Sequence, residues 1–182
     1  MFLIVASKKD EASMNIARKI REIQYFEILS ERFQEDPIYY KKIGDHEVKL
    51  VFIGEDAINA HSITDFFNPE IIVFVSRHSS LSGIPTWSVH TPGNLANEAK
   101  YGGLPRKVSV SPASMMKNTL KEMAKIREET ALNYNVSYEC THHGPSLDAP
   151  TMFVELGSTP KQWVDLEAAE GIARALINAL CN

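Results

Sequence analysis

Short apolar runs alternate with longer amphipathic stretches along the chain, and this alternation predicts an α/β domain. The apolar runs, each expected to form a strand, lie at residues 2–6, 48–53, 71–75, 86–89, 136–140 and 152–156. The runs at 48–53 and 71–75 are almost wholly apolar, as central strands buried on both faces would be. We therefore expect a sheet whose central strands are covered on both sides.

Apolar residues recur at near-helical spacing in three of the longer stretches, which predicts amphipathic helices there. The first covers residues 11–23, with Asp10 as its N-cap. The second begins with Ser111 as the N-cap and Pro112 at the first helical position. The third begins with a capping box and continues as one apolar stripe over residues 159–180.

Length and composition indicate an ordinary soluble protein with a single domain, residues 1–182. The chain is 44% hydrophobic and 23% charged, and no apolar run approaches the roughly 18–20 residues of a membrane span. The first apolar run follows no basic segment and precedes no small-residue cleavage site, so we expect a core strand and not a signal peptide. Two cysteines, Cys140 and Cys181, do not make a disulfide framework, which favours a cytoplasmic location.

The net charge of −4 argues against binding of nucleic acid over the whole surface, although local basic patches remain. Two groups of cations stand out, and either could instead be an ordinary solvated helix face. The groups are Lys100, Arg106, Lys107, Lys117, Lys121, Lys125 and Arg127, and Lys8, Lys9, Arg18, Lys19 and Arg21.

Four polar clusters directly follow apolar runs. They are SRHSS at 76–80, HTPGN at 90–94, THHGP at 141–145 and GST at 157–159. If the preceding strands are parallel neighbours, the clusters meet at one edge of the sheet, where ligands gather in open α/β sheets. The long irregular stretch at 76–106 is also typical of a functional segment.

Several residues in these clusters have both a functional and a structural interpretation. Arg77 lies beside serines after a central strand, which suits a phosphate or carboxylate, but it could be a surface residue. His90 could be a hydrogen-bonded core histidine, and Gly93 could simply supply a positive φ in a turn. The segment 157–159 could bind an anion at a helix N-terminus or only cap the helix.

The adjacent pair His142 and His143 raises a geometric question. On a continuing strand the two side chains would point to opposite faces, whereas on a loop they could converge. Convergence would allow a zinc site or general acid–base chemistry, and the spacing alone does not decide between them. Additional ligands are available in principle from His78, His90, Glu139 or Glu155.

Six sequence blocks occur in an order that resembles a known family. The blocks are SRHSS, HTPGN, AKYGG, SPASMMK, YECTHHGP and FVELGST, and KKDEASMNI near the start agrees with them. Over nearly its whole length the chain resembles the archaeal and plant type of D-aminoacyl-tRNA deacylase. The resemblance implies a cytoplasmic enzyme that requires zinc and hydrolyses the ester joining a D-amino acid, D-tyrosine among them, to the 3′ end of tRNA. It also implies a single α/β domain with a mixed sheet flanked by helices, similar to phosphorylases and peptidyl-tRNA hydrolase.

The resemblance and the chemistry of ester hydrolysis together suggest roles for individual residues, and the resemblance places the histidine-bearing motifs on His78, His90, His142 and His143. The expected catalytic residues are His78, His142 and His143. The expected zinc ligands are His90, His142, His143 and Glu139. The expected substrate-binding residues are Arg77, Ser79, Thr91, Gly93, Asn94, Gly157 and Ser158. Backbone N–H groups near 157–159 or in the Gly93-Asn94 turn are expected to hold the oxyanion.

The family pattern continues into a glycine-rich, histidine-containing segment of the GGGHYAP kind, which residues 1–182 do not contain. Two further functions stay open, and the first of them follows from this difference. One is a module that binds the aminoacyl end of tRNA without chemistry. The other is a metal-free nucleoside enzyme of the phosphorylase type, which Arg77, His78 and the anion site at 157–159 would support.

Overall fold

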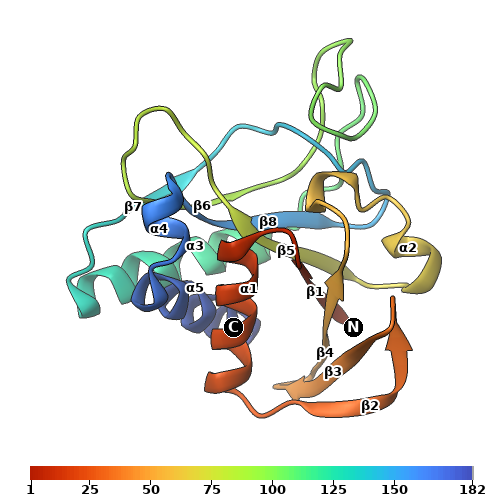
Figure 1. Ribbon diagram of the computed structural model, residues 1–182, viewed down its shortest axis with the longest axis horizontal. Helices are drawn as coiled ribbons and strands as arrows, with labels where there is room; N and C mark the ends of the chain where they lie inside the picture. The colour runs from red at the N-terminus through yellow and green to blue at the C-terminus, as the bar shows by residue number, and fades with distance from the viewer. Residues whose placement is uncertain (182) are drawn as a thin grey trace.

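An eight-stranded mixed sheet forms the centre of the structure, a computed structural model that describes residues 1–181 (Figure 1). The strands are β1 (Phe2–Ser7), β2 (Glu27–Phe33), β3 (Asp36–Ile43), β4 (His46–Ile53), β5 (Ile71–Arg77), β6 (Thr86–His90), β7 (Asn135–Tyr138) and β8 (Thr151–Gly157). Their order across the sheet is β2-β3-β4-β1-β5-β8-β6-β7. The predicted mixed sheet is confirmed, and all six predicted strands are present.

The central strands β4, β1, β5 and β8 run parallel to one another. At one edge β3 pairs antiparallel with β4, and β2 pairs antiparallel with β3. At the other edge β6 runs antiparallel to β8 and parallel to β7. The hairpin of β2 and β3 was not predicted, because the outermost strand β2 is mostly exposed and has no apolar run.

Helices cover both faces of the sheet unequally. The helical segments are α1 (Glu11–Ile23), η1 (Ala57–Asn59), α2 (Ile63–Phe66), α3 (Ala113–Thr130), α4 (Pro160–Trp163) and α5 (Leu166–Leu180). The long helices α1, α3 and α5 lie together on one face, where their apolar side chains form the larger core with alternate residues of the strands (Figure 1). The other face is covered by α2 and by loops around Leu147. This second face leaves room for polar side chains of the strands.

Of the N-caps predicted for the first two long helices, one is confirmed and one is wrong. Asp10 caps α1 as predicted, because its carboxylate accepts the backbone N–H of Ser13. The predicted N-cap at Ser111 is wrong, since Pro112 occupies that position without a side-chain hydrogen bond. The hydroxyl of Ser111 instead lies 3.1 Å from the sulfur of Met116.

The predicted helix over 159–180 is two helices. The capping box at Thr159 is present and starts α4, which ends at Trp163. The carboxylate of Asp165 then accepts the backbone N–H groups of Glu167 and Ala168 and caps α5. A second cap therefore interrupts the helix while the apolar stripe continues. No helix within residues 1–181 is long and apolar enough to cross a membrane.

Candidate functional site

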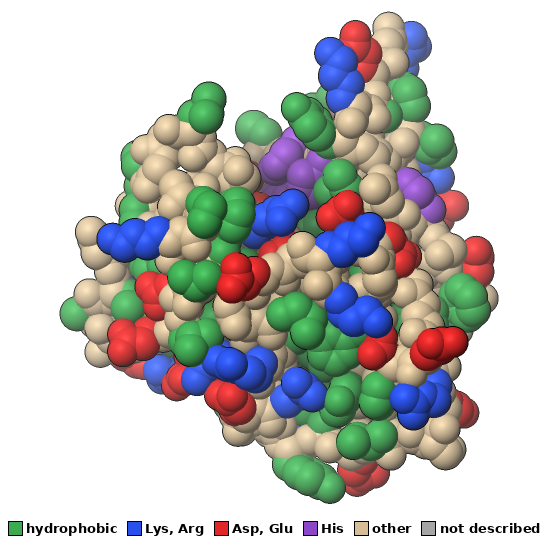
Figure 2. Space-filling model, in the orientation of Figure 1, with side chains coloured by type: hydrophobic (Ala, Val, Ile, Leu, Met, Phe, Trp, Pro, Cys, Tyr) green, Lys and Arg blue, Asp and Glu red, His purple; other side chains and the backbone are tan. Residues whose placement is uncertain are grey.

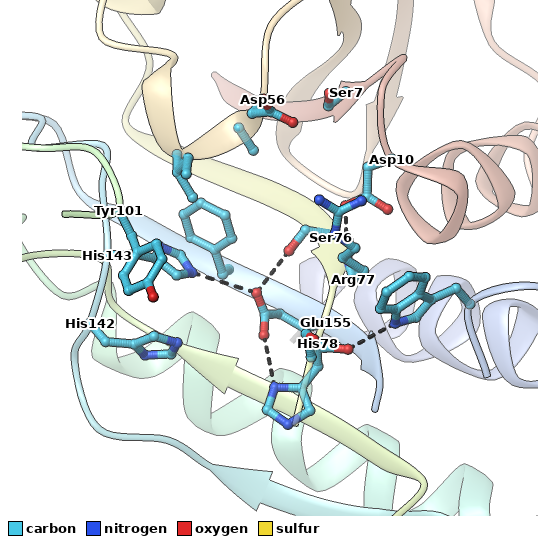
Figure 3. A pocket seen from close by; sticks show the side chains of 15 residues that line it. Ser7, Asp10, Asp56, Ser76, Arg77, His78, Tyr101, His142, His143 and Glu155 are labelled. Atoms are coloured by element: carbon cyan, nitrogen blue, oxygen red, sulfur yellow. Dashed lines mark hydrogen bonds and ion pairs between the residues drawn. The ribbon is translucent and has the colours of Figure 1, made fainter. Parts of the chain in front are cut away.

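A pocket of about 740 Å³ opens on the face of the sheet that the long helices do not cover. Polar side chains from five separate parts of the chain line it, together with the rings of Tyr101, Phe153 and Trp163. Figure 2 shows histidines in this hollow, and Figure 3 shows the pocket from close by. The polar lining residues are Ser7, Asp10, Asp56, Ser76, Arg77, His78, Ser79, His142, His143 and Glu155.

Glu155 on β8 lies at the centre of the site and is only 3% exposed. The hydroxyl of Ser76 donates a 2.9 Å hydrogen bond to its Oε1. Ring nitrogens of His78, His90 and His143 lie 3.4, 3.5 and 3.8 Å from its carboxylate oxygens. Burial by itself would raise the pKa of Glu155, but the histidines outweigh burial and hold the pKa well below its ordinary value. The site therefore contains a buried, ionised carboxylate.

Three histidines gather beside this carboxylate. One ring nitrogen from each of His90, His142 and His143 lies within 4.8 Å of the others. His90 ends β6, and a β-bridge between Pro92 and His142 brings the second segment alongside. His143 has a φ of +43°, so the backbone turns there and does not continue as a strand. The turn answers the geometric question, because both adjacent imidazoles face the same site.

The hydrogen bonds of these rings determine which nitrogen carries the proton. In each ring Nδ1 contacts a backbone carbonyl oxygen, at 3.3 Å for His90 to Thr91, 2.8 Å for His142 to Cys140 and 2.7 Å for His143 to Gly144. A carbonyl oxygen only accepts hydrogen bonds, so we assign the proton to Nδ1 and a lone pair to Nε2 in the neutral rings. Nε2 of His90 is buried and makes no hydrogen bond. Imidazoles that donate to carbonyls from the other ring nitrogen are typical of metal ligands.

The charges around the three rings also favour a cation. In the neutral rings, Nε2 lone pairs of His90 and His143 would face the ionised carboxylate of Glu155. Such an arrangement is repulsive unless protons or a metal ion lie between these groups. Burial and the neighbouring His90 lower the pKa of His142, which keeps that ring neutral and able to bind a metal. Three histidines are a ligand set that suits zinc.

A second group of possible ligands adjoins the first through Glu155. Nδ1 of His78 lies 3.1 Å from a carboxylate oxygen of Glu139 and 3.4 Å from one of Glu155. The hydrogen bond to Glu155 raises the pKa of His78, so this ring can hold a proton near neutral pH. One ligand atom from each of the three residues lies within 4.8 Å of the others. This group can therefore transfer protons or hold a cation.

Arg77 provides a positive charge at the other end of the pocket. Its backbone N–H donates to Asp10, whose pKa is raised by burial, and its guanidinium lies 5.3 Å from the ring centre of Trp163. The indole N–H of Trp163 donates to the carbonyl oxygen of His78 at 2.8 Å. Ser79 lines the same region. An anionic part of a ligand would be attracted to this end.

Five predicted substrate-binding residues lie outside the residues that line the pocket: Thr91, Gly93, Asn94, Gly157 and Ser158. The hydroxyls of Thr91 and Ser158 and the amide of Asn94 contact other parts of the chain. Gly157 supports the site indirectly, because a Cβ there would lie 2.5 Å from the carbonyl oxygen of His78. In this structure none of the five therefore lines the pocket.

The backbone N–H groups expected to hold an oxyanion are already engaged. Gly93 donates to the carbonyl oxygen of His143, and Asn94 donates to that of Lys107. The N–H of Thr159 donates to the side chain of Gln162 in the capping box. The predicted oxyanion donors Gly93, Asn94 and Thr159 are therefore not available in this structure.

The polar clusters do not meet for the predicted reason. Because β6 is antiparallel to β8, His90 pairs with Phe153 while Thr86 pairs with Gly157. The site consequently lies along the face of β8 around Glu155, where the segments after β6 and β7 meet the carboxyl ends of β1 and β5. The sequence does contain one sign of this role for Glu155, because it is a single acidic residue inside the apolar run TMFVELG.

Residues 65–182 match a family model described as D-aminoacyl-tRNA deacylase. A protein called D-aminoacyl-tRNA deacylase from Pyrococcus abyssi is 35% identical over 189 residues, covering 100% of this chain and 66% of the relative. One of the same name from Methanocaldococcus jannaschii is 35% identical over 185 residues, covering 98% of this chain and 63% of the relative. The chain thus spans slightly less than two thirds of the length of these relatives.

Solved structures share the fold. A conserved protein of unknown function, AF0625, matches with a TM-score of 0.87 and 31% identity, covering 100% of this chain and 64% of that one. A putative methylthioadenosine nucleosidase from Weissella paramesenteroides matches with a TM-score of 0.60 and 13% identity, covering 100% of this chain and 99% of that one. The second likeness concerns the fold alone and agrees with the predicted α/β architecture.

Proposed function

Because the chain belongs to the D-aminoacyl-tRNA deacylase family, we propose that it hydrolyses the ester between a D-amino acid and the 3′ end of tRNA. The observation that carries the proposal is the buried carboxylate of Glu155, which lies 3.4–3.8 Å from ring nitrogens of three histidines beside an open pocket. Ester hydrolysis needs an activated water and proton transfer to the leaving oxygen, and this group of residues suits both tasks. A tRNA ester as the substrate also agrees with the cytoplasmic location expected from the sequence.

For zinc, the ligands that we propose are His90, His142 and His143. The support is the buried Nε2 of His90, which makes no hydrogen bond, and the carbonyl contacts of all three Nδ1 atoms. Three protein ligands leave a coordination position free for substrate or water, as in catalytic zinc sites. When bound, zinc supplies Lewis acidity that polarises an ester carbonyl and makes water more acidic.

The proton transfers are assigned to His78 and Glu139, which contact each other at 3.1 Å. Water adds to the ester carbonyl, and the proton that it loses goes to this pair. The pair returns a proton to the 3′ oxygen as its bond to the acyl carbon breaks, which yields a free D-amino acid and a 3′ hydroxyl. Glu155 orients His78 and stabilises its protonated form, and Ser76 holds Glu155 in place.

The test is hydrolysis of tRNA charged with D-tyrosine or with L-tyrosine. The native chain should release D-tyrosine, chelation should stop the reaction, and added zinc should restore it. His142→Ala should slow release by about 100-fold or more, whereas replacing the exposed His61, which lies outside both ligand groups, should not. Normal turnover by His142→Ala would refute the proposed site.

Two other results would favour the alternative functions. Binding of tRNA ends without release of amino acid would indicate a binding module of this fold. Cleavage of a nucleoside without zinc would indicate an enzyme of the phosphorylase type.

A further inference from the structure

An irregular segment beside the pocket, residues 94–108, is here called the arm. It forms the green loops at the upper right of Figure 1 and rises beside the histidine-lined hollow in Figure 2. It contains no helix or regular strand and is joined at its base by a β-bridge between Gly93 and Val108. Its position raises the question of what it contacts when a substrate enters.

The arm is attached directly to the turn that carries the histidines. The carbonyl oxygen of Tyr101 accepts a 2.9 Å hydrogen bond from the N–H of Gly144, the residue after His143. The next residue, Gly102, has a φ of +74°, and a Cβ there would collide with the carbonyl oxygen of Ile58. The backbone at Tyr101 is therefore held in a defined place relative to the site.

Tyr101 presents an aromatic ring at the mouth of the pocket. The residue lines the pocket together with His142 and His143, yet it is 71% exposed. Leu95 and Leu104 on the same arm are also largely exposed. An exposed aromatic ring beside a site for tRNA ester hydrolysis is suited to stacking on a base, because every base has a flat π-face.

The arm is positively charged although the whole chain carries a net charge of −4. It holds the three cations Lys100, Arg106 and Lys107 against one carboxylate, Glu98. Lys100 pairs with Glu98 at 2.8 Å, and Lys107 pairs with Asp148, whose side chain is 93% exposed. Exposed pairs of this kind contribute little, so a phosphate can replace either carboxylate. This charge favours a nucleic-acid ligand over an apolar peptide.

We propose that the arm binds the single-stranded 3′ end of RNA, with the ring of Tyr101 stacked on the terminal base. Lys100, Arg106 and Lys107 contact the phosphates that precede this base. A base on Tyr101 places the attached ribose beside the turn that carries His143, where the ester is to be cleaved. The inference rests on the proposed function and assigns its nucleotide-binding subsite.

The first experiment measures binding by fluorescence anisotropy. The probe is a short, 5′-fluorescein-labelled single-stranded RNA that ends in CCA with a free 3′ hydroxyl. Tyr101→Ala should weaken binding by about tenfold, and Tyr101→Phe should restore it because stacking needs only the ring. The matched control is Tyr25→Ala, which removes an 80% exposed tyrosine outside the arm and should bind as the native chain does. Equal affinity of Tyr101→Ala and Tyr25→Ala would overturn the proposal.

A second experiment tests the charges of the arm. The double variant Arg106→Gln/Lys107→Gln should reduce the slope of log affinity against log salt by about 0.7 for each phosphate that the arm no longer neutralises. Lys125→Gln removes an exposed cation of α3 and is the matched control, for which the slope should be unchanged. An unchanged slope in the double variant would remove the phosphate part of the proposal.

These measurements separate the arm from the chemistry, because the RNA probe carries no ester. If D-tyrosine is released but Tyr101→Ala binds the probe normally, the arm proposal fails and the proposed function stands. If probe binding depends on Tyr101 but no ester is cleaved, the proposed function fails and the arm proposal stands. A native chain that does not bind the probe also overturns the arm proposal.

Discussion

Zinc should raise the unfolding temperature of the native chain, and His90→Ala should remove most of that rise. At a zinc concentration of about 100 times Kd, binding stabilises the folded state by about 2.7 kcal/mol. For a chain of 182 residues, about 2–4 °C per kcal/mol gives a rise of roughly 5–11 °C. His90 is fully buried and its Nε2 makes no hydrogen bond, so we expect this nitrogen to be a principal ligand. A loss of affinity of about 100-fold would leave about 0.4 kcal/mol at the same zinc concentration, or roughly 1–2 °C.

The assay is differential scanning calorimetry with chelator and with added zinc, each variant being compared with its own metal-free state. That comparison matters because His90→Ala also opens a cavity and lowers the metal-free unfolding temperature. His61→Ala is the control, since this exposed histidine belongs to neither ligand group. An equal zinc-dependent rise in His90→Ala and the native chain would refute the assignment of ligands. No rise in the native chain would refute the zinc site itself.

Three further predictions concern packing, pH and the support of the carboxylate. Gly171→Ala should lower the free energy of unfolding by about 1–3 kcal/mol, although alanine has the better helix propensity, because the new Cβ would lie 2.5 Å from the buried ring of Trp87. An unchanged thermal transition would contradict this prediction. Burial raises the pKa of Tyr134 above its ordinary value of 10.0, so the unfolded chain loses this proton first and stability should fall as the pH rises above about 10. In urea denaturation at increasing pH, Tyr134→Phe should show a smaller decline, and parallel curves would contradict the assignment. Ser76→Ala removes a 2.9 Å hydrogen bond to ionised Glu155, and such a bond is worth about 1.5–3 kcal/mol. The variant should therefore lower kcat/KM for D-tyrosyl-tRNA by about tenfold or more. Native kinetics would show that Ser76 does not position the carboxylate.

Several residues of the pocket could be predicted from the sequence, because they directly follow predicted strands. Arg77, His78 and Ser79 line the pocket, as do His142 and His143. Their residue types and their places after apolar runs are local properties, so the sequence shows them. The same local reasoning found the Asp10 cap and the capping box before α4. It missed the interruption before α5, where the apolar stripe continues through a second cap.

The central role of Glu155 could not be predicted from its neighbours in the sequence. The sequence offered it as one available ligand among several, whereas the structure makes it a member of one ligand group and a neighbour of His90 and His143 in the other. Its importance comes from its neighbours on other strands, Ser76 on β5 and His90 on β6. No window of consecutive residues contains these contacts.

The sequence by itself determined six of the eight strands, the starts of α1 and α4 and the kinds of side chain available for chemistry, because these depend on patterns among near neighbours. Only the tertiary structure decided that β6 runs antiparallel to β8, so that His90 lies along the face that carries Glu155. Only the folded backbone at His143, with its positive φ, turned two adjacent imidazoles to one side. Strand direction and register are settled by hydrogen bonds and packing between segments distant in sequence, and the site depends on both.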